Sequence, residues 1–151
     1  FRIVSPEDYQ DFVDDIYDRD YNISLLPFLT TAFGDVFIYV KNNQFGDHVV
    51  FLNVRYATFQ IFTKNIPTLV NILLINKSSL EINFKLESYS QIKEQLGVPN
   101  YDECYAYIPS LALGGKDNIE NLQIVKVLPY LDIIGQSVDE FTRFEPFSLN
   151  E

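Results

Sequence analysis

The sequence contains one cysteine, one histidine and no methionine among its 151 residues. A lone cysteine, Cys104, cannot form an internal disulfide, which suits a reducing compartment, and we therefore expect a cytoplasmic protein. One Cys and one His cannot build a structural zinc site, so we expect neither a metal nor a cofactor. The start, FRIVSPEDYQ, lacks the basic and apolar regions of a signal peptide. Because methionine is absent, we expect that the initiator was removed or that the sequence is a piece of a longer protein.

Long apolar runs and clusters of basic residues are also missing. Without a run of about 18 apolar residues, the sequence predicts no membrane-spanning helix. Only 11 Lys and Arg stand against 21 Asp and Glu, which gives a formal net charge of −10. Nucleic acids and anionic membrane surfaces are therefore poor partners, because their phosphates would be repelled.

The negative charge is concentrated at both ends of the chain. Residues 1–20 carry seven acids and two bases, and residues 132–151 carry five acids and one base. The segment between them, 21–131, is nearly neutral, with nine acids and eight bases. Acidic ends favour a cationic protein as partner, because complementary fields speed encounter. The alternative is that the charge only aids solubility.

The residues that are abundant are apolar and aromatic: the hydrophobic fraction is 47%, with 13 Phe and 10 Tyr. A chain of this length and composition can bury a core without disulfides. The pattern predicts an α+β fold, an antiparallel sheet with flanking short helices, in one domain covering residues 1–151. The predicted strands are 36–40, 48–54, 58–62, 104–108 and 122–127.

Proline and serine predict where the helices begin. Ser5 is expected to cap a helix whose first residue is Pro6, and Pro67 and Pro129 are expected to open two others. Ser79 and Ser88 are expected to cap two short helices between them. The second of these helices should end at Gly97, two residues before Pro99. Residues 25–35, LLPFLTTAFGD, are expected to lead from a loop into the first long strand.

The helix that begins at Pro6 carries acids on the face opposite its apolar stripe. Acids near its C-terminal end oppose the helix dipole, at a cost of roughly a few tenths of a kcal/mol per charge. That cost suggests a function, although a solvated face is the ordinary explanation. The residues predicted to bind a partner are Asp11, Asp14, Asp15 and Asp18.

The stretch 101–127, YDECYAYIPSLALGGKDNIENLQIVKV, resembles a reactive loop but lacks the parts of one. Cys104 has no base close in sequence, and the adjacent acids would raise a thiol pKa, so a buried small hydrophobe is the better interpretation. LGGKDN lacks the first glycine and the Ser/Thr of a phosphate loop. Gly114 and Gly115 are expected to make a tight turn, and Asn121 to bond to its own loop. A pair of carboxylates that meet in space stays possible.

The same stretch is similar to the C-terminal domain of the type VI secretion immunity proteins, a family that protects bacteria against a secreted DNase effector. The resemblance covers residues 98–138 and rests on an acid-Glu-Cys-aromatic element, a proline, Leu-Gly-Gly, Glu-Asn-Leu and a Lys-Val strand. A second element, SPEDY followed by TAFGD, resembles the end of a GAD-like domain, within residues 1–40. The motif residues, which we expect to be structural, are Asp35, Glu103, Cys104, Pro109, Gly114, Gly115, Glu120 and Asn121.

Two classes of function follow. The resemblance implies a non-catalytic immunity protein that binds and neutralises a cognate toxin with a basic surface. The alternative is a small-ligand-binding domain or a hydrolase-like enzyme that uses clustered carboxylates. A pocket with convergent carboxylates of raised pKa would favour the second class.

Overall fold

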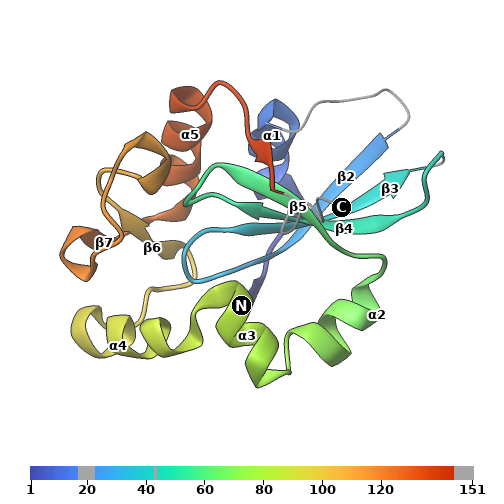
Figure 1. Ribbon diagram of the computed structural model, residues 1–151. Coiled ribbons are helices and arrows are strands. Elements are labelled where there is room, and N and C mark those ends of the chain that lie inside the picture. Colours follow the sequence, from blue (N-terminus) through green and yellow to red (C-terminus); the bar gives the residue numbers. More distant parts are fainter. Residues whose placement is uncertain (17–22, 43, 145–151) are drawn as a thin grey trace, which may run out of the picture.

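The computed structural model describes residues 1–16, 23–42 and 44–144. Its larger sheet has six strands in the order β1-β2-β3-β4-β5-β8, and a smaller sheet pairs β6 with β7 (Figure 1). The strands are β1 (Arg2–Ile3), β2 (Ile23–Thr30), β3 (Val36–Asn42), β4 (His48–Asn53), β5 (Thr58–Thr63), β6 (Glu103–Tyr107), β7 (Leu122–Lys126) and β8 (Thr142–Arg143). The α+β class is confirmed, with one correction: β8 pairs parallel to β5, while the other pairs are antiparallel.

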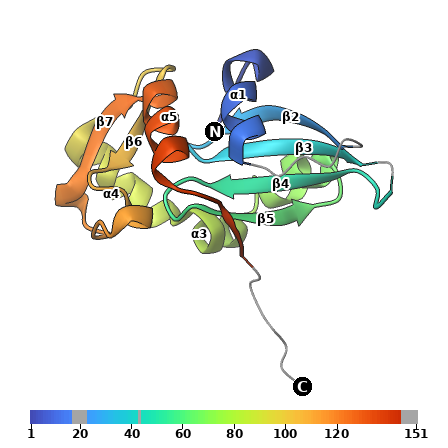
Figure 2. The same cartoon turned by 90° about the horizontal axis from the view of Figure 1, so that it is seen from above.

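Helices cover both faces of the larger sheet. The helices are α1 (Pro6–Ile16), α2 (Ile66–Thr68), α3 (Lys77–Phe84), α4 (Leu86–Leu96) and α5 (Val127–Ser137). Figures 1 and 2 show α1 and α5 side by side on one face and α2 and α3 on the other. The small β6–β7 sheet and α4 lie together at one end. The loops that connect these elements therefore meet where the two sheets join.

The central strands β3 and β4 have continuous apolar runs, Val36–Val40 and Val49–Leu52, because both of their faces are buried there. In β3, Val36 and Ile38 belong to the core beneath α1 and α5, while Phe37 belongs to the core on the α2–α3 side. In β4, Leu52 and Phe51 divide in the same way. The alternation of period two thus places each side chain against a different set of helices.

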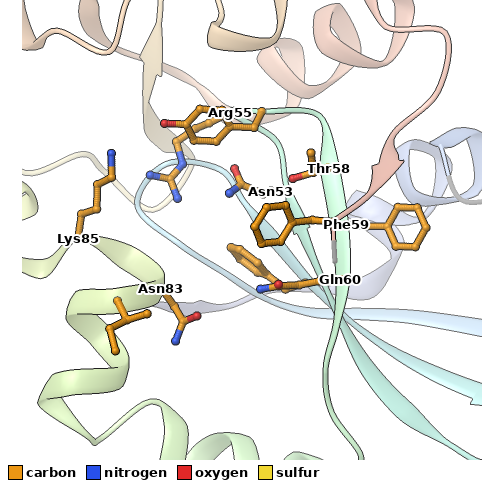
Figure 3. Close-up of a pocket in the computed structure, with 11 residues that line it drawn as sticks. Asn53, Arg55, Thr58, Phe59, Gln60, Asn83 and Lys85 are labelled. Atoms are coloured by element: carbon orange, nitrogen blue, oxygen red, sulfur yellow. The ribbon is translucent and has the colours of Figure 1, made fainter. Parts of the chain in front are cut away.

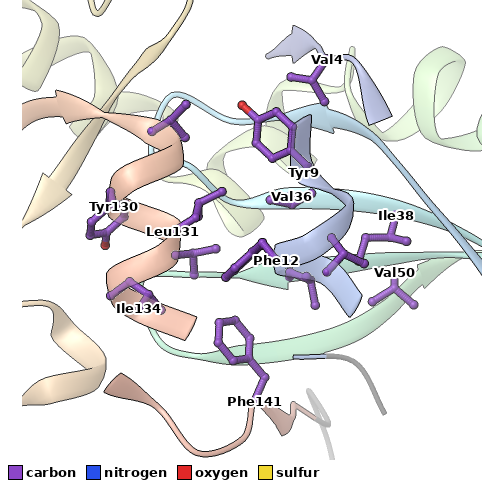
Figure 4. Close-up of a cluster of buried hydrophobic side chains, with 14 of the residues drawn as sticks. Val4, Tyr9, Phe12, Val36, Ile38, Val50, Tyr130, Leu131, Ile134 and Phe141 are labelled. Atoms are coloured by element: carbon purple, nitrogen blue, oxygen red, sulfur yellow. The ribbon is translucent and has the colours of Figure 1, made fainter. Parts of the chain in front are cut away.

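The core beneath α1 and α5 is the largest of three (Figure 4). α1 buries Tyr9, Phe12 and Val13 in it, and this confirms the predicted apolar stripe. Phe141, which is 2% exposed, closes the same core from beyond α5. Its ring lies 6.2 Å from that of Phe12, centroid to centroid, in an edge arrangement. The segment after α5 is therefore anchored to the sheet by an aromatic side chain.

The other two cores contain several aromatic side chains. On the α2–α3 side, the rings of Phe37, Phe51, Phe62 and Phe84 contact one another. At the junction with the small sheet, Tyr105 is fully buried and its ring lies 5.6 Å from that of Phe33. Aromatic pairs at such distances contribute roughly 0.5–1.5 kcal/mol beyond their buried area.

Strand β2 was not predicted, and it contains Pro27, a residue normally confined to edge strands and irregularities. The structure accommodates Pro27 because the pairing of β2 with β3 shifts register between Pro27 and Leu29. A proline at such an irregularity does not remove a regular ladder bond. Residues 25–35, expected only to lead into the first long strand, are therefore themselves a strand up to Thr30. Only the turn Thr31–Asp35 remains a loop.

The caps predicted for the middle helices are also wrong. Asn76, not Ser79, caps α3, and its side chain accepts a hydrogen bond from the Ser79 N–H at 3.0 Å. Ser88 lies inside α4, which has no side-chain cap. The predicted end of α4 at Gly97, with φ +83°, is confirmed. Helix α5 begins two residues before Pro129.

Candidate functional site

Three of the four predicted partner-binding acids, Asp11, Asp14 and Asp15, lie on α1. α1 carries five carboxylates, two of them in its first turn, and no basic residue. Asp11 and Asp15 are exposed. Asp14 is half-buried and accepts a hydrogen bond of 2.8 Å from the amide of Gln10. Asp18 lies outside the described residues. Two of the four carboxylates are therefore open to a partner in the described part of the chain.

Helix α5 lies against α1 and extends the acidic surface. A Cβ built on Gly135 of α5 would lie 3.6 Å from the ring of Phe12 in α1, so the two helices approach closely. α5 contributes exposed Asp132 and has no basic residue. Beside it, Ile133 is 60% exposed. We call α1 and α5 together the acidic helix pair. It combines carboxylates from two elements with an exposed apolar side chain.

The second feature is a buried ion pair between Asp35 and Arg55. Asp35 ends the TAFGD turn before β3, and Arg55 follows β4. Arg55 Nη2 lies 2.8 Å from Asp35 Oδ2, and their side chains are 7% and 0% exposed. Asp35 also accepts hydrogen bonds from the Val54 N–H at 3.0 Å and from the Thr31 hydroxyl at 3.0 Å. The carboxylate therefore ties together the two turns at one end of the sheet.

The arginine is held from a second side. Its guanidinium carbon lies 4.6 Å from the centre of the Phe33 ring, a cation–π contact. Sequence reasoning treated Asp35 as a motif residue and missed Arg55. The only signal was a charged residue directly after an apolar strand, and nothing in the sequence specified its partner.

Asp117, in the LGGKDN loop, joins the small sheet to α3 and α4. Its carboxylate accepts hydrogen bonds from Tyr107 at 2.6 Å, Lys85 at 2.8 Å and Tyr56 at 3.3 Å. These bonds, that of Lys85 first, hold the pKa of Asp117 below its usual range. Burial and the bond to Asp117 raise the pKa of Tyr107. Asp117 thus holds the loop against the small sheet and the α3–α4 connection, and we call this set of bonds the Asp117 clasp. Sequence reasoning missed the role of Asp117.

The two glycines of that loop differ in their reason for being glycine. Gly114 has φ +88°, which is the positive φ expected for the turn. Gly115 has no such φ, but a Cβ there would lie 2.0 Å from the Pro109 carbonyl oxygen. Asn121 donates to the Lys116 carbonyl at 3.1 Å, so the predicted bond to its own loop is confirmed. Glu120 is exposed, and its backbone N–H donates a hydrogen bond of 3.1 Å to the side-chain oxygen of Asn118.

Cys104 is 1% exposed in β6. Burial, and secondly the charge of Asp35, raise the pKa of the Cys104 thiol to about 12. A protonated, inaccessible thiol is a poor nucleophile. Ile108, the last residue of the predicted strand 104–108, is 47% exposed because β6 has already ended at Tyr107. The neighbouring Glu103 pairs with Lys126 at 3.3 Å on the surface.

A pocket of about 660 Å³ opens between α3 and the start of β5 (Figure 3). Its residues are Phe51, Asn53, Arg55, Tyr56, Thr58, Phe59, Gln60, Ile82, Asn83, Lys85 and Phe144. Among these residues no carboxylate occurs, so the clustered-carboxylate chemistry has no support there. Arg55 also lines a smaller cavity of about 190 Å³ beside Phe84 and Tyr89.

Two searches over the described part of the chain give negative results. Within residues 1–16, 23–42 and 44–144, no three His, Cys, Asp or Glu side chains are grouped so as to hold a metal ion. Over the same residues, no helix combines the length and the apolar character needed to cross a bilayer.

Comparisons with known proteins add a family to this geometry. Residues 64–137 match the family described as T6SS immunity protein Tdi1, C-terminal. The matched segment contains α2 to α5 and the small sheet, including the Asp117 clasp. The resemblance to a type VI secretion immunity family that was stated from the motifs is therefore confirmed over this segment. The match starts well before residue 98, where the motif resemblance began. The resemblance of residues 1–40 to a GAD-like domain stays a prediction.

A solved structure shares the fold. The crystal structure of Atu4351 from Agrobacterium tumefaciens is 18% identical, with a TM-score of 0.62, over 90% of this chain and 66% of that chain. At this identity the likeness concerns the fold alone. The present chain spans 66% of the length of that protein. Curated protein sequences gave no match.

Proposed function

We propose that this protein is an immunity protein that binds a cognate secreted toxin and neutralises it by occupying a basic surface of the toxin. The observation that carries the proposal is the family match over residues 64–137. The immunity role is that of the family. The toxin, its basic surface and the contact made by this chain are proposed here.

The acidic helix pair supports the choice of surface. Its two adjoining helices carry six carboxylates and no basic residue between Pro6 and Ile16 and between Val127 and Ser137. Asp14 and Asp15 lie in the last turn of α1, where a negative charge opposes the helix dipole. A helix that keeps such charges gains little for its own stability. A cationic partner would compensate them.

Helix α5 also carries an exposed apolar residue that is a suitable anchor. Ile133 is 60% exposed and sits next to Asp132. Interfaces commonly join a buried apolar centre with a polar rim, and the rim charges act mainly on the association rate. We therefore assign Ile133 to the centre of the contact, and Asp11, Asp15 and Asp132 to its rim.

The proposal is tested by protection in cells. The toxin encoded beside this gene is expressed in a bacterium with and without the chain, and survival is counted. We expect full protection by the parent protein and a stable complex in pull-down. Replacing Ile133 with Glu should weaken the complex and the protection, whereas replacing exposed Ile75, on the opposite side of the sheet, with Glu should not. A parent chain that neither binds nor protects would refute the immunity function. Equal effects of both replacements would refute only the proposed contact surface.

A further inference from the structure

The pocket between α3 and β5 has the character of a ligand site that the proposed function does not use. Its volume of about 660 Å³ lies within the roughly 300–1,000 Å³ of small-molecule sites. Phe51, Phe59, Phe144 and Ile82 provide apolar walls. Side chains that can bond a ligand face the same space from β4, β5 and α3, and Figure 3 shows Asn53, Arg55, Gln60 and Asn83 around it.

The charge of this pocket is opposite to that of the whole protein. Among its described lining residues the charged ones are Arg55 and Lys85, both cations, in a chain of net charge −10. Their counter-ions, Asp35 and Asp117, do not line the pocket. The charged side chains of the lining are therefore cationic, and each is paired with a carboxylate that lies outside the lining.

One buried polar atom of the pocket lining lacks a partner within the described residues. The Oδ1 of Asn53 has no hydrogen-bond donor there. Asp35 contacts Nε and Nη2 of the Arg55 guanidinium. Buried groups of this kind are normally satisfied, and leaving one unsatisfied is costly. The site thus has a fixed cationic donor and a free acceptor close to aromatic walls.

Arg55 is prepared for binding by its own surroundings. Asp35 and the Phe33 ring hold the guanidinium in place, and its side chain is 7% exposed. A ligand that accepts from it therefore does not have to order a flexible side chain, which is one of the costs of binding. Lys85, at the rim, is 54% exposed and adds a second, adjustable cation.

We propose that this pocket binds a small molecule composed of a flat aromatic ring, an anionic group and an adjacent N–H or O–H donor. The anion, a carboxylate or a phosphate, accepts from Arg55 and Lys85. The donor satisfies Asn53 Oδ1, and the ring packs on Phe59 and Phe144. This activity is separate from toxin binding, since α3 lies on the opposite face of the sheet from the acidic helix pair (Figures 1 and 2).

The test is a titration of the ¹⁵N-labelled full chain followed by ¹H–¹⁵N NMR. The probes are N-acetyl-L-phenylalanine, which has the ring, the carboxylate and the N–H donor, its neutral primary amide, and phenyl phosphate. We expect the carboxylate or the phosphate to shift the amides of Tyr56, Gln60 and Asn83. The neutral amide should bind about fivefold more weakly, the effect of one unit charge at close range. No shifts, shifts centred elsewhere, or equal affinity for the acid and its amide would overturn the proposal.

Matched variants connect the binding to the pocket. Ile82 lines the pocket and is 80% exposed, whereas Ile75 is 72% exposed and does not line it. Ile82→Glu should repel the anion and weaken binding about fivefold, while Ile75→Glu should leave it unchanged. Both changes are at exposed positions, so the fold should tolerate them. Equal binding by the two variants would place the anion outside this pocket.

Discussion

Arg55 and Asp35 form a buried ion pair of 2.8 Å that fixes two turns at one end of the main sheet. Asp35 is fully buried and also accepts from the Val54 N–H and the Thr31 hydroxyl. Removing one partner of such a pair leaves the other as an uncompensated buried charge. The pair therefore sets the geometry of the TAFGD turn and of the adjoining pocket.

We expect Asp35→Asn to lower the free energy of unfolding by about 3–5 kcal/mol. The control is Lys126→Gln, which breaks an exposed pair with Asp102 whose side chains are 56% and 62% exposed. That change should cost at most about 1 kcal/mol. Urea unfolding followed by circular dichroism measures both. A cost for Asp35→Asn no larger than that of the control would contradict the structural role of the pair.

Gly114→Ala should destabilise the protein by about 1 kcal/mol or more, because φ +88° strains a residue with a Cβ. Gly115→Ala should cost more, because its Cβ would overlap the Pro109 carbonyl oxygen. Gly135→Ala is the control: this glycine is helical, its Cβ would meet only ordinary contacts, and alanine favours a helix. Thermal unfolding of the three variants decides. Equal stability of all three would show that the loop does not need its glycines.

The Cys104 thiol should react slowly with DTNB in the native protein and rapidly in denaturant, because it is 1% exposed and its pKa is raised to about 12. Cys104→Ala should cost stability by removing a buried sulfur without reducing binding of the toxin. The control for accessibility is the same reaction in urea. Rapid labelling of the native thiol would contradict the buried position.

The same thiol predicts a loss of stability in alkali. Its pKa is raised on folding, so above the ordinary thiol pKa of about 8.5 the unfolded chain releases a proton that the folded chain keeps. Stability should therefore be fully present below that value and should fall as pH rises toward 12, by at most about 1.4 kcal/mol per pH unit. Urea unfolding of the parent and of Cys104→Ala across this range measures the difference. Parallel pH profiles would contradict the raised pKa.

Much of the fold could be predicted because periodicity is local information. The strands β3 to β7 and the apolar stripe of α1 follow directly from alternating or helical spacing. Strand β2 was missed because Pro27 is tolerated only through a register shift, which depends on its neighbours in the sheet. Strand β8 has two residues, and its pairing with β5 depends on tertiary structure.

The sites also divide into those that local sequence patterns predict and those that depend on tertiary structure. The acids of α1 could be found from sequence, since they share one helix face. The Asp35–Arg55 pair and the Asp117 clasp join residues that are 20 and up to 61 positions apart. Nothing in one sequence specifies such pairs. The pocket depends on Arg55 and Lys85 facing the same space, which only the packing of α3 on the sheet determines.

The most direct test of the proposed function is the association rate of the chain with its cognate toxin, measured by stopped flow at low and high salt. Asp11, Asp14, Asp15 and Asp18 replaced together with Asn should slow association several-fold at low salt, because complementary charge acts mainly on this rate. The difference should shrink at high salt as the Debye length falls from ~30 Å to ~3 Å.

Variants with two substitutions each control for the change in net charge. Asp11→Asn with Asp15→Asn changes the charge by the same amount as Glu87→Gln with Glu94→Gln on α4, and all four side chains are exposed. The account predicts slower association for the α1 pair and an unchanged rate for the α4 pair. Equal rates for both, or a parent rate that does not depend on salt, would contradict binding through the acidic helix pair.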